Sequence, residues 1–109
     1  MRVRNLVTVG YGVDLDHVQS LLLEVARASQ IVNHEEGPIA PRVRVRALGP
    51  NGIEIELQVW VLDPELKEPA MHEVLSGIYK RLRAEGIPIS YAKQDLYVKE
   101  LPSARFGDG

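Results

Sequence analysis

Hydrophobic and polar residues alternate most regularly in the middle of the chain, from Gly52 to Asp63. A period of two is typical of a β-strand, because successive side chains point to opposite faces of a sheet. One face of this segment is apolar and consists of Ile53, Ile55, Leu57, Val59 and Val61. The other is mixed and consists of Glu54, Glu56, Gln58, Trp60 and Leu62. We therefore expect a central strand in a sheet that helices cover on one face only.

Two further segments with this period predict neighbouring strands. Val3 to Tyr11 is rich in β-branched residues, and Arg42 to Leu48 alternates arginines with small or branched apolar residues. The turn at residues 49–52, Gly-Pro-Asn-Gly, predicts a hairpin with a three-residue loop.

The register that follows from this loop pairs Gly49 with Ile53 and places Arg46 opposite Glu56. We expect this pair on the open face of the sheet, exposed to solvent. Exposed cross-strand ion pairs contribute only about 0.2–1 kcal/mol to stability.

Two segments have the helical period of 3.6 residues. The first begins after Asp14, a good N-cap, and runs to about Ser29; the second begins near Pro69, runs to about Glu85 and has Gly86 as its C-cap. The apolar stripe of the first helix consists of Val18, Leu21, Leu22, Val25 and Ala26. That of the second consists of Met71, Val74, Leu75, Ile78 and Leu82.

Residues 31–41 show no sustained period and are predicted to be a connection, and residues 87–101 are predicted to form a last strand with a bend at 92–94. This order predicts the α+β class: a ferredoxin-like βαββαβ open-faced sandwich, with a four-stranded antiparallel sheet and two helices on one face. We expect one domain over residues 1–101 and a short, disordered tail over 102–109. The fold alone does not reveal a function.

Composition narrows the class of function. The chain has 109 residues, 45% of them hydrophobic, a formal net charge of -2 and no cysteine. These values indicate a single hydrophobic core, no overall positive field for nucleic acid or anionic lipid, and no disulfide or cysteine metal site. No apolar run reaches the ~20 residues that span a bilayer, and the N-terminus does not resemble a signal peptide. The cytoplasm is the expected compartment.

Candidate chemistry is sparse. His17, His34 and His72 are scattered over a helix start, a loop and a second helix start, so we expect structural histidines and no metal site. The turn Gly10-Tyr11-Gly12 lacks the third glycine of a nucleotide-binding loop. We expect no cofactor and no catalytic residue, since no nucleophile lies beside a recognisable base in sequence.

RNA binding is also disfavoured. A common RNA-binding module has the same order of elements and places stacking aromatic residues on its third strand. Here that strand offers acids and a single aromatic residue, Trp60, and the glutamates should partly neutralise the neighbouring arginines.

Four segments, in order and spacing, resemble a known family. They are Val7–Asp14 before an amphipathic helix, Pro41 before a strand, Leu57–Val61 in the central strand, and Gly-Ile at 86–87 followed eight residues later by Asp-Leu at 95–96. Over most of the chain they are similar to the cytoplasmic C-terminal α/β domain of small-conductance mechanosensitive (MscS-type) ion channels. The family's last motif, Ile-Pro-Phe-Pro-Gln, corresponds to Ile-Ser-Tyr-Ala-Lys here, which keeps the aromatic residue at Tyr91 but neither proline.

The resemblance implies a non-enzymatic role in a cytosolic cage, built as a homoheptamer below a membrane pore on the cytoplasmic side of the inner membrane. It implies assembly with copies of itself, solute sieving and modulation of gating during osmotic shock. The chain lacks the pore and most of the preceding β-domain, so we expect a fragment that meets the membrane only through the pore region of a parent channel. The alternative is a stand-alone ferredoxin-like regulatory module that binds an amino acid or a metal at a dimer interface, which the turn at Gly10-Tyr11-Gly12 would favour.

The last predicted strand is the candidate assembly segment. In the resembling family, the final strand contributes to a barrel shared between subunits. Leu96 and Val98 alternate with polar neighbours, as in a strand with one apolar side. We therefore expect Tyr91, Leu96, Tyr97 and Val98 to serve assembly, although the same residues could instead complete the fourth strand of the monomer.

Overall fold

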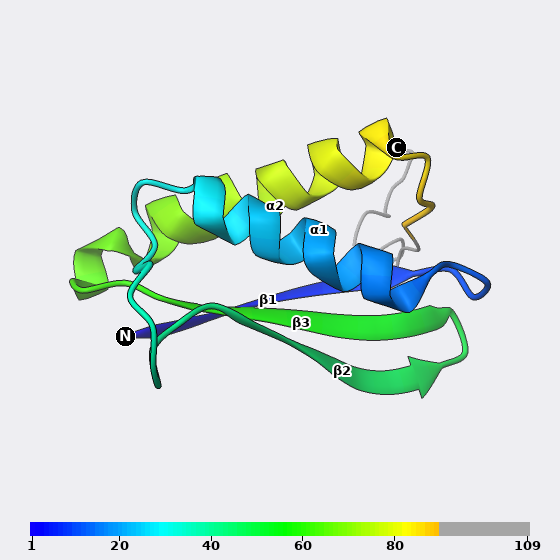
Figure 1. Ribbon diagram of the computed structural model, residues 1–109, viewed down its shortest axis with the longest axis horizontal. Coiled ribbons are helices and arrows are strands. Elements are labelled where there is room, and N and C mark those ends of the chain that lie inside the picture. Colours follow the sequence, from blue (N-terminus) through cyan, green and yellow to red (C-terminus); the bar gives the residue numbers. More distant parts are fainter. Residues whose placement is uncertain (90–109) are drawn as a thin grey trace, which may run out of the picture.

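The computed structural model describes residues 1–89, which form two layers (Figure 1). One layer is an antiparallel sheet with the strand order β1-β3-β2, and the other consists of two helices on one face of it. The strands are β1 (Arg2–Val9), β2 (Arg42–Gly49) and β3 (Gly52–Trp60). The helices are α1 (Leu15–Ala28) and α2 (Lys67–Ala84), and the 3₁₀ turn η1 (Pro64–Leu66) precedes α2.

The predicted class and the one-sided helix layer are confirmed, but the four-stranded ferredoxin-like sheet is not observed. Within residues 1–89 the sheet has three strands. Most of the predicted fourth strand, residues 87–101, lies outside the described residues, as does the predicted tail. Up to Ile89 the chain runs beside β1, where Ile89 forms an antiparallel bridge with Val9 and the Gly10 N–H donates to the Pro88 carbonyl at 3.3 Å.

The core lies between the helices and the inner face of β3. All five apolar residues predicted for this face are at most 8% exposed: Ile53, Ile55, Leu57, Val59 and Val61. Helix α1 packs over β2 and β3, whereas α2 packs over β1. The predicted helix stripes are buried except for Val25 and Met71, which pack at the margin of the core, and Leu75, which is 38% exposed.

The helix ends follow the capping residues. The Asp14 side chain accepts a hydrogen bond from the His17 N–H at 3.2 Å, so α1 begins at the predicted residue. Helix α2 begins two residues before Pro69, because Asp63 caps η1 by accepting from the Glu65 N–H at 3.0 Å and the turn continues into the helix. Gly86 adopts φ +74°, as a residue after a helix end commonly does.

The predicted hairpin loop is wrong by one residue. Gly49 pairs with Gly52, not with Ile53, so the loop contains only residues 50 and 51. The glycine at position 52 adopts φ +143° and is already part of β3. A glycine therefore serves as the first paired residue of the strand and not as the last residue of the loop.

A β-bulge in β2 also changes the predicted register. Arg44, not Arg46, lies opposite Glu56. The register then shifts between Val45 and Ala47, so Arg46 is the extra residue of the bulge. Sequence periodicity did not reveal the bulge, because the arginines continue to alternate through it.

The burial of β3 predicts the effect of shortening Leu57, which is 0% exposed. Leu57→Ala should lower the free energy of unfolding by about 2–5 kcal/mol, because it removes buried methyl groups and leaves a cavity. Leu62→Ala is the matched control, since Leu62 lies just beyond the same strand and is 82% exposed. Urea denaturation of both variants gives the two values, and equal midpoints would contradict the placement of Leu57 in the core.

The close approach of β1 to the hairpin predicts a second effect. A Cβ atom at Gly52 would lie 2.2 Å from the Val9 carbonyl oxygen, whereas at Gly12, which also has a positive φ of +94°, no atom lies within 4 Å. Gly12→Ala should therefore cost about 1–2 kcal/mol of backbone strain, and Gly52→Ala about 2–5 kcal/mol, because a steric clash adds to the strain. Thermal unfolding of both variants measures the difference, and a Gly52→Ala variant no less stable than Gly12→Ala would disprove the close approach.

Candidate functional site: the arginine face of the sheet

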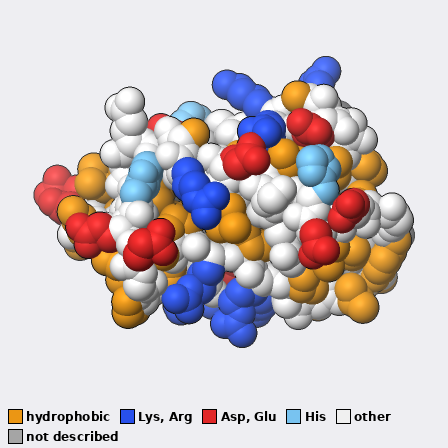
Figure 2. Space-filling view, viewed as in Figure 1, with side chains coloured by type: hydrophobic (Ala, Val, Ile, Leu, Met, Phe, Trp, Pro, Cys, Tyr) orange, Lys and Arg blue, Asp and Glu red, His pale blue; other side chains and the backbone are white. Residues whose placement is uncertain are grey.

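The sheet face away from the helices carries a concentrated group of charged side chains. Arginines occupy alternating positions of both edge strands, so they project on the same side as the polar residues of β3. We call this surface the arginine face; it consists of Arg2, Arg4, Arg42, Arg44, Arg46, Glu54, Glu56 and Gln58. Figure 2, in the same view as Figure 1, shows a group of Lys and Arg side chains at the lower edge of the molecule, on the sheet side; others lie over the helices. A depression of about 280 Å³ lies between the edge strands on this face.

Glu56 lies at the centre of the arginine face and is only 1% exposed, although no described helix covers it. Its Oε1 accepts a hydrogen bond from Arg46 Nη1 at 3.0 Å, and its Oε2 lies 3.3 Å from Arg4 Nε. Both arginine side chains are about half exposed, at 47% and 54%. Their guanidinium groups thus contact the buried carboxylate while about half of each side chain remains open to solvent.

The predicted contact between Arg46 and Glu56 is therefore confirmed, but its predicted exposure is wrong. Sequence reasoning also missed Arg4 as the second partner. In the register of β1 with β3, Arg4 lies opposite Gln58 and Leu6 opposite Glu56, so Arg4 reaches the carboxylate diagonally. The available signal was the alternation of Arg2 and Arg4 with inward-facing residues at the start of β1.

The arginines also control the ionisation of Glu56. Burial raises the pKa of the carboxyl group, since it removes water from the charged form. Hydrogen bonds from Arg46 and Gln58, together with the charges of Arg46 and Arg4, outweigh burial and hold the pKa below its ordinary value of 4.5. Glu56 is therefore a carboxylate at neutral pH.

The other three arginines have no carboxylate partner among residues 1–89. Arg42 stacks over Trp60, with its Cζ 5.7 Å from the ring centroid, and its Nη2 donates to the Pro38 carbonyl at 3.4 Å. Arg2 and Arg44 are exposed. Neutralisation by glutamates is thus limited to Arg4 and Arg46.

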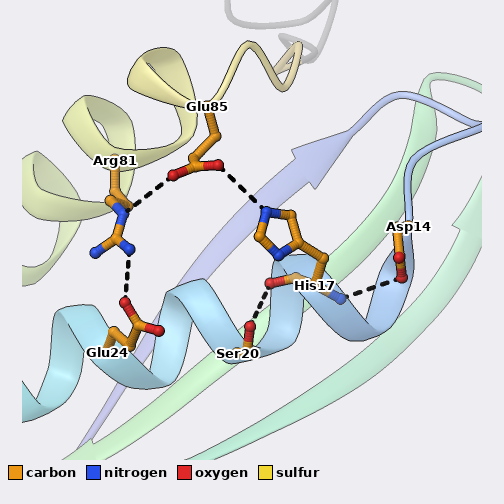
Figure 3. Close-up of polar contacts among 6 residues, drawn as sticks. All are labelled: Asp14, His17, Ser20, Glu24, Arg81 and Glu85. Atoms are coloured by element: carbon orange, nitrogen blue, oxygen red, sulfur yellow. Dashed lines mark hydrogen bonds and ion pairs between the residues drawn. The ribbon is translucent and has the colours of Figure 1, made fainter.

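A second group of charged residues connects the two helices (Figure 3). Arg81 Nη2 donates to Glu24 Oε1 at 2.6 Å, and Arg81 Nε lies 3.8 Å from Glu85 Oε2. The other Glu85 oxygen lies 3.3 Å from His17 Nε2. These four side chains are 37–50% exposed, so the contacts help to orient α1 against α2 and contribute little stability.

The three histidines lie apart from one another. His17 contacts Glu85, and His34 Nε2 lies 2.6 Å from the Ser29 carbonyl oxygen, which can only accept, so this nitrogen donates. Across the described chain, no group of three or more His, Asp or Glu side chains could hold a metal ion.

The turn at Gly10-Tyr11-Gly12 has a structural explanation. The Tyr11 hydroxyl donates to the Gly49 carbonyl at 2.6 Å and thus connects this turn to the β2–β3 hairpin. Gly12 adopts φ +94°, which favours glycine. The contact between this turn and the hairpin therefore explains the Gly10-Tyr11-Gly12 sequence, which would otherwise favour a ligand-binding module.

The predicted assembly residues Tyr91, Leu96, Tyr97 and Val98 lie outside the described residues. The described chain ends beside β1, at the bridge between Val9 and Ile89. Their role therefore remains a prediction.

The lowered pKa of Glu56 predicts how stability depends on pH. A folded-state pKa below the unfolded value contributes stability above pH 4.5, and this contribution is lost as the pH falls through the folded-state pKa. Glu56→Gln should lower the free energy of unfolding at pH 7 by about 1–3 kcal/mol, since charged hydrogen bonds become neutral ones. The difference from the unsubstituted chain should shrink towards low pH.

Glu54→Gln, an exposed glutamate on the same strand face, is the matched control. Its free energy of unfolding should still fall towards low pH as that of the unsubstituted chain does, because Glu56 is intact. Urea denaturation between pH 7 and about pH 3 measures all three proteins. A Glu56→Gln variant with the same deficit at every pH would contradict the ionisation of Glu56 as the cause.

Comparison with known proteins agrees with this fold. The family model described as "Mechanosensitive ion channel MscS, C-terminal" matches residues 6–89 of the 109-residue chain. A search of curated proteins finds no match. Among solved structures, the closed-state crystal structure of MscS from Helicobacter pylori is similar with a TM-score of 0.73 and 18% identity. The alignment covers 97% of this chain and 38% of that one.

Two cryo-electron microscopy structures of MSL1 from Arabidopsis thaliana are also similar. The wild-type structure gives a TM-score of 0.64 with 13% identity and covers 84% of this chain and 32% of the MSL1 chain. The second gives a TM-score of 0.62 with 14% identity and covers 84% and 33%. At these identities the structures show the common fold, and the family follows from the sequence model. The chain belongs to the family of C-terminal domains of MscS mechanosensitive ion channels.

Proposed function

We propose that this chain contributes to the oligomeric cytosolic cage of an MscS-type mechanosensitive channel. The observation that carries the proposal is the family match over residues 6–89. The chain spans about a third of the channel chains it resembles, at 32–38% of their length. No helix in the described part of the chain is long and apolar enough to cross a membrane. The proposed role is therefore assembly and filtering of solutes, with conduction left to the pore of the channel.

The packing of residues 1–89 supports a subunit domain that folds before it assembles into the cage. Among residues 1–89, the buried apolar residues lie between Val3 and Leu82, in the sheet, the two helices and the adjoining connections. Residues 1–89 thus contain a hydrophobic core of their own.

The edges of the described sheet support assembly through strands. On its outer side, β2 has no partner strand within residues 1–89, and β1 meets only the single bridge to Ile89. Unpaired N–H and C=O groups at a sheet edge can pair with another chain. On β2, Val45 and Leu48 are 39% and 72% exposed, which adds apolar surface beside this edge.

In the proposed cage the partners are further copies of this chain, in the homoheptamer that the family resemblance implies. The cage lies on the cytoplasmic side of the inner membrane, where it filters solutes and modulates gating during osmotic shock. The residues proposed to join neighbouring subunits are Tyr91, Leu96, Tyr97 and Val98.

Deletion of all residues after Asp95 removes Leu96, Tyr97 and Val98 and tests their role in assembly. We expect the truncated chain to keep its helical and strand signals in circular dichroism, because the deletion leaves the described core of residues 1–89 intact, and to self-associate less in light scattering. Deletion of residues 102–109 alone is the control and should leave self-association unchanged. Loss of the folded signal after the longer deletion would mean that the strand belongs to the monomer core; unchanged association would remove its role in assembly.

A further inference from the structure

We propose that the arginine face binds a small anion with several phosphate groups, such as an inorganic or nucleoside polyphosphate. The inference goes beyond the cage role and does not depend on it. It rests on the uncompensated charge of this face, on the placement of Glu56 and on the depression between the edge strands.

The charge of the arginine face is opposite in sign to that of the whole chain. Among residues 1–89, five arginines and two glutamates lie on this face, so three positive charges are in excess there. The whole chain has 13 basic and 15 acidic residues and a net charge of -2, so the rest of the molecule is acidic. An anion would therefore be attracted to this face and not to the molecule in general.

Glu56 arranges the site without occupying its surface. The carboxylate holds Arg4 and Arg46 at 3.3 and 3.0 Å, one from each edge strand, and is itself 1% exposed. Each of these arginines keeps further N–H donors free, because a guanidinium has five. Arginines that are already held in position lose less conformational entropy when they bind a ligand.

Gln58 occupies the position where an acid would complete the neutralisation. It lies opposite Arg4 on one side and Arg42 on the other, and it is 5% exposed. As a neutral side chain it leaves the charge of Arg42 uncompensated. Arg2 and Arg44, which also have no carboxylate partner among residues 1–89, line the depression of about 280 Å³.

The chemistry of the donors selects the ligand. Guanidinium groups bind phosphate oxygens in a bidentate geometry, and several of them converge on one depression. An anion with a single charge would leave most of the excess positive charge of the face uncompensated. A chain of phosphate groups can reach arginines of both edge strands at once, which is why we infer a polyphosphate.

Isothermal titration of the 109-residue chain with inorganic tripolyphosphate tests the proposal, at an ionic strength held constant with sodium chloride. We expect saturable binding at one site per chain. The double variant Arg2→Gln, Arg44→Gln should bind at least about tenfold more weakly, because it removes two guanidiniums that make no ion pair in the described chain. Circular dichroism checks that the variant remains folded.

Arg27→Gln is the matched control, since Arg27 is an exposed arginine in the last turn of α1, in the helix layer. Its affinity should stay within about twofold of the unsubstituted chain. A titration with ATP separates the sources of the polyphosphate: equal affinity means that the phosphate chain alone is recognised, and tighter binding means that the nucleoside adds contacts. Absence of saturable binding, or an equal loss in Arg27→Gln, would overturn the proposal.

Discussion

The central strand β3 has buried residues on both faces, although described helices cover only one of them. On the helix side the buried residues are apolar, such as Ile55 and Leu57, and need no polar partner. On the other side the strand presents Glu56, and a buried carboxylate without partners costs several kcal/mol. Arginines from both edge strands surround it and supply the compensating charge. One side chain thus links the positions of β1, β2 and β3.

The contacts of Glu56 with these arginines also determine the charge of the sheet face. Glu56 is buried while the two arginines that contact it stay about half exposed, so the sheet face is positive on a chain whose net charge is negative. The helices close the core on one face of the sheet, the outer edge of β2 has no partner strand within residues 1–89, and the arginine face carries the charge. Core formation, proposed assembly and proposed anion binding therefore use different parts of the same sheet.

The likeness to MscS from Helicobacter pylori and to MSL1 persists at only 13–18% identity. Folds survive such divergence because the alternation of apolar residues and the approximate core volume are sufficient to specify the packing. Surface residues are under no such constraint. The arginine face therefore depends on the contacts in this chain and does not follow from the family fold.

The sequence by itself determined the central strand, its inward-facing residues, the extent of α1 and the one-sided helix layer, because these depend on local periodicity and capping. It also suggested the family, through the order of several short segments. It did not determine the Gly49–Gly52 pairing, the bulge at Arg46 or the second partner of Glu56. Those depend on how three strands meet in space: a hairpin register is decided by backbone pairing along both strands, and the burial of Glu56 requires Arg4, which lies 52 residues away in the chain. Only the tertiary structure, in which β1 pairs with β3, brings that arginine to the carboxylate.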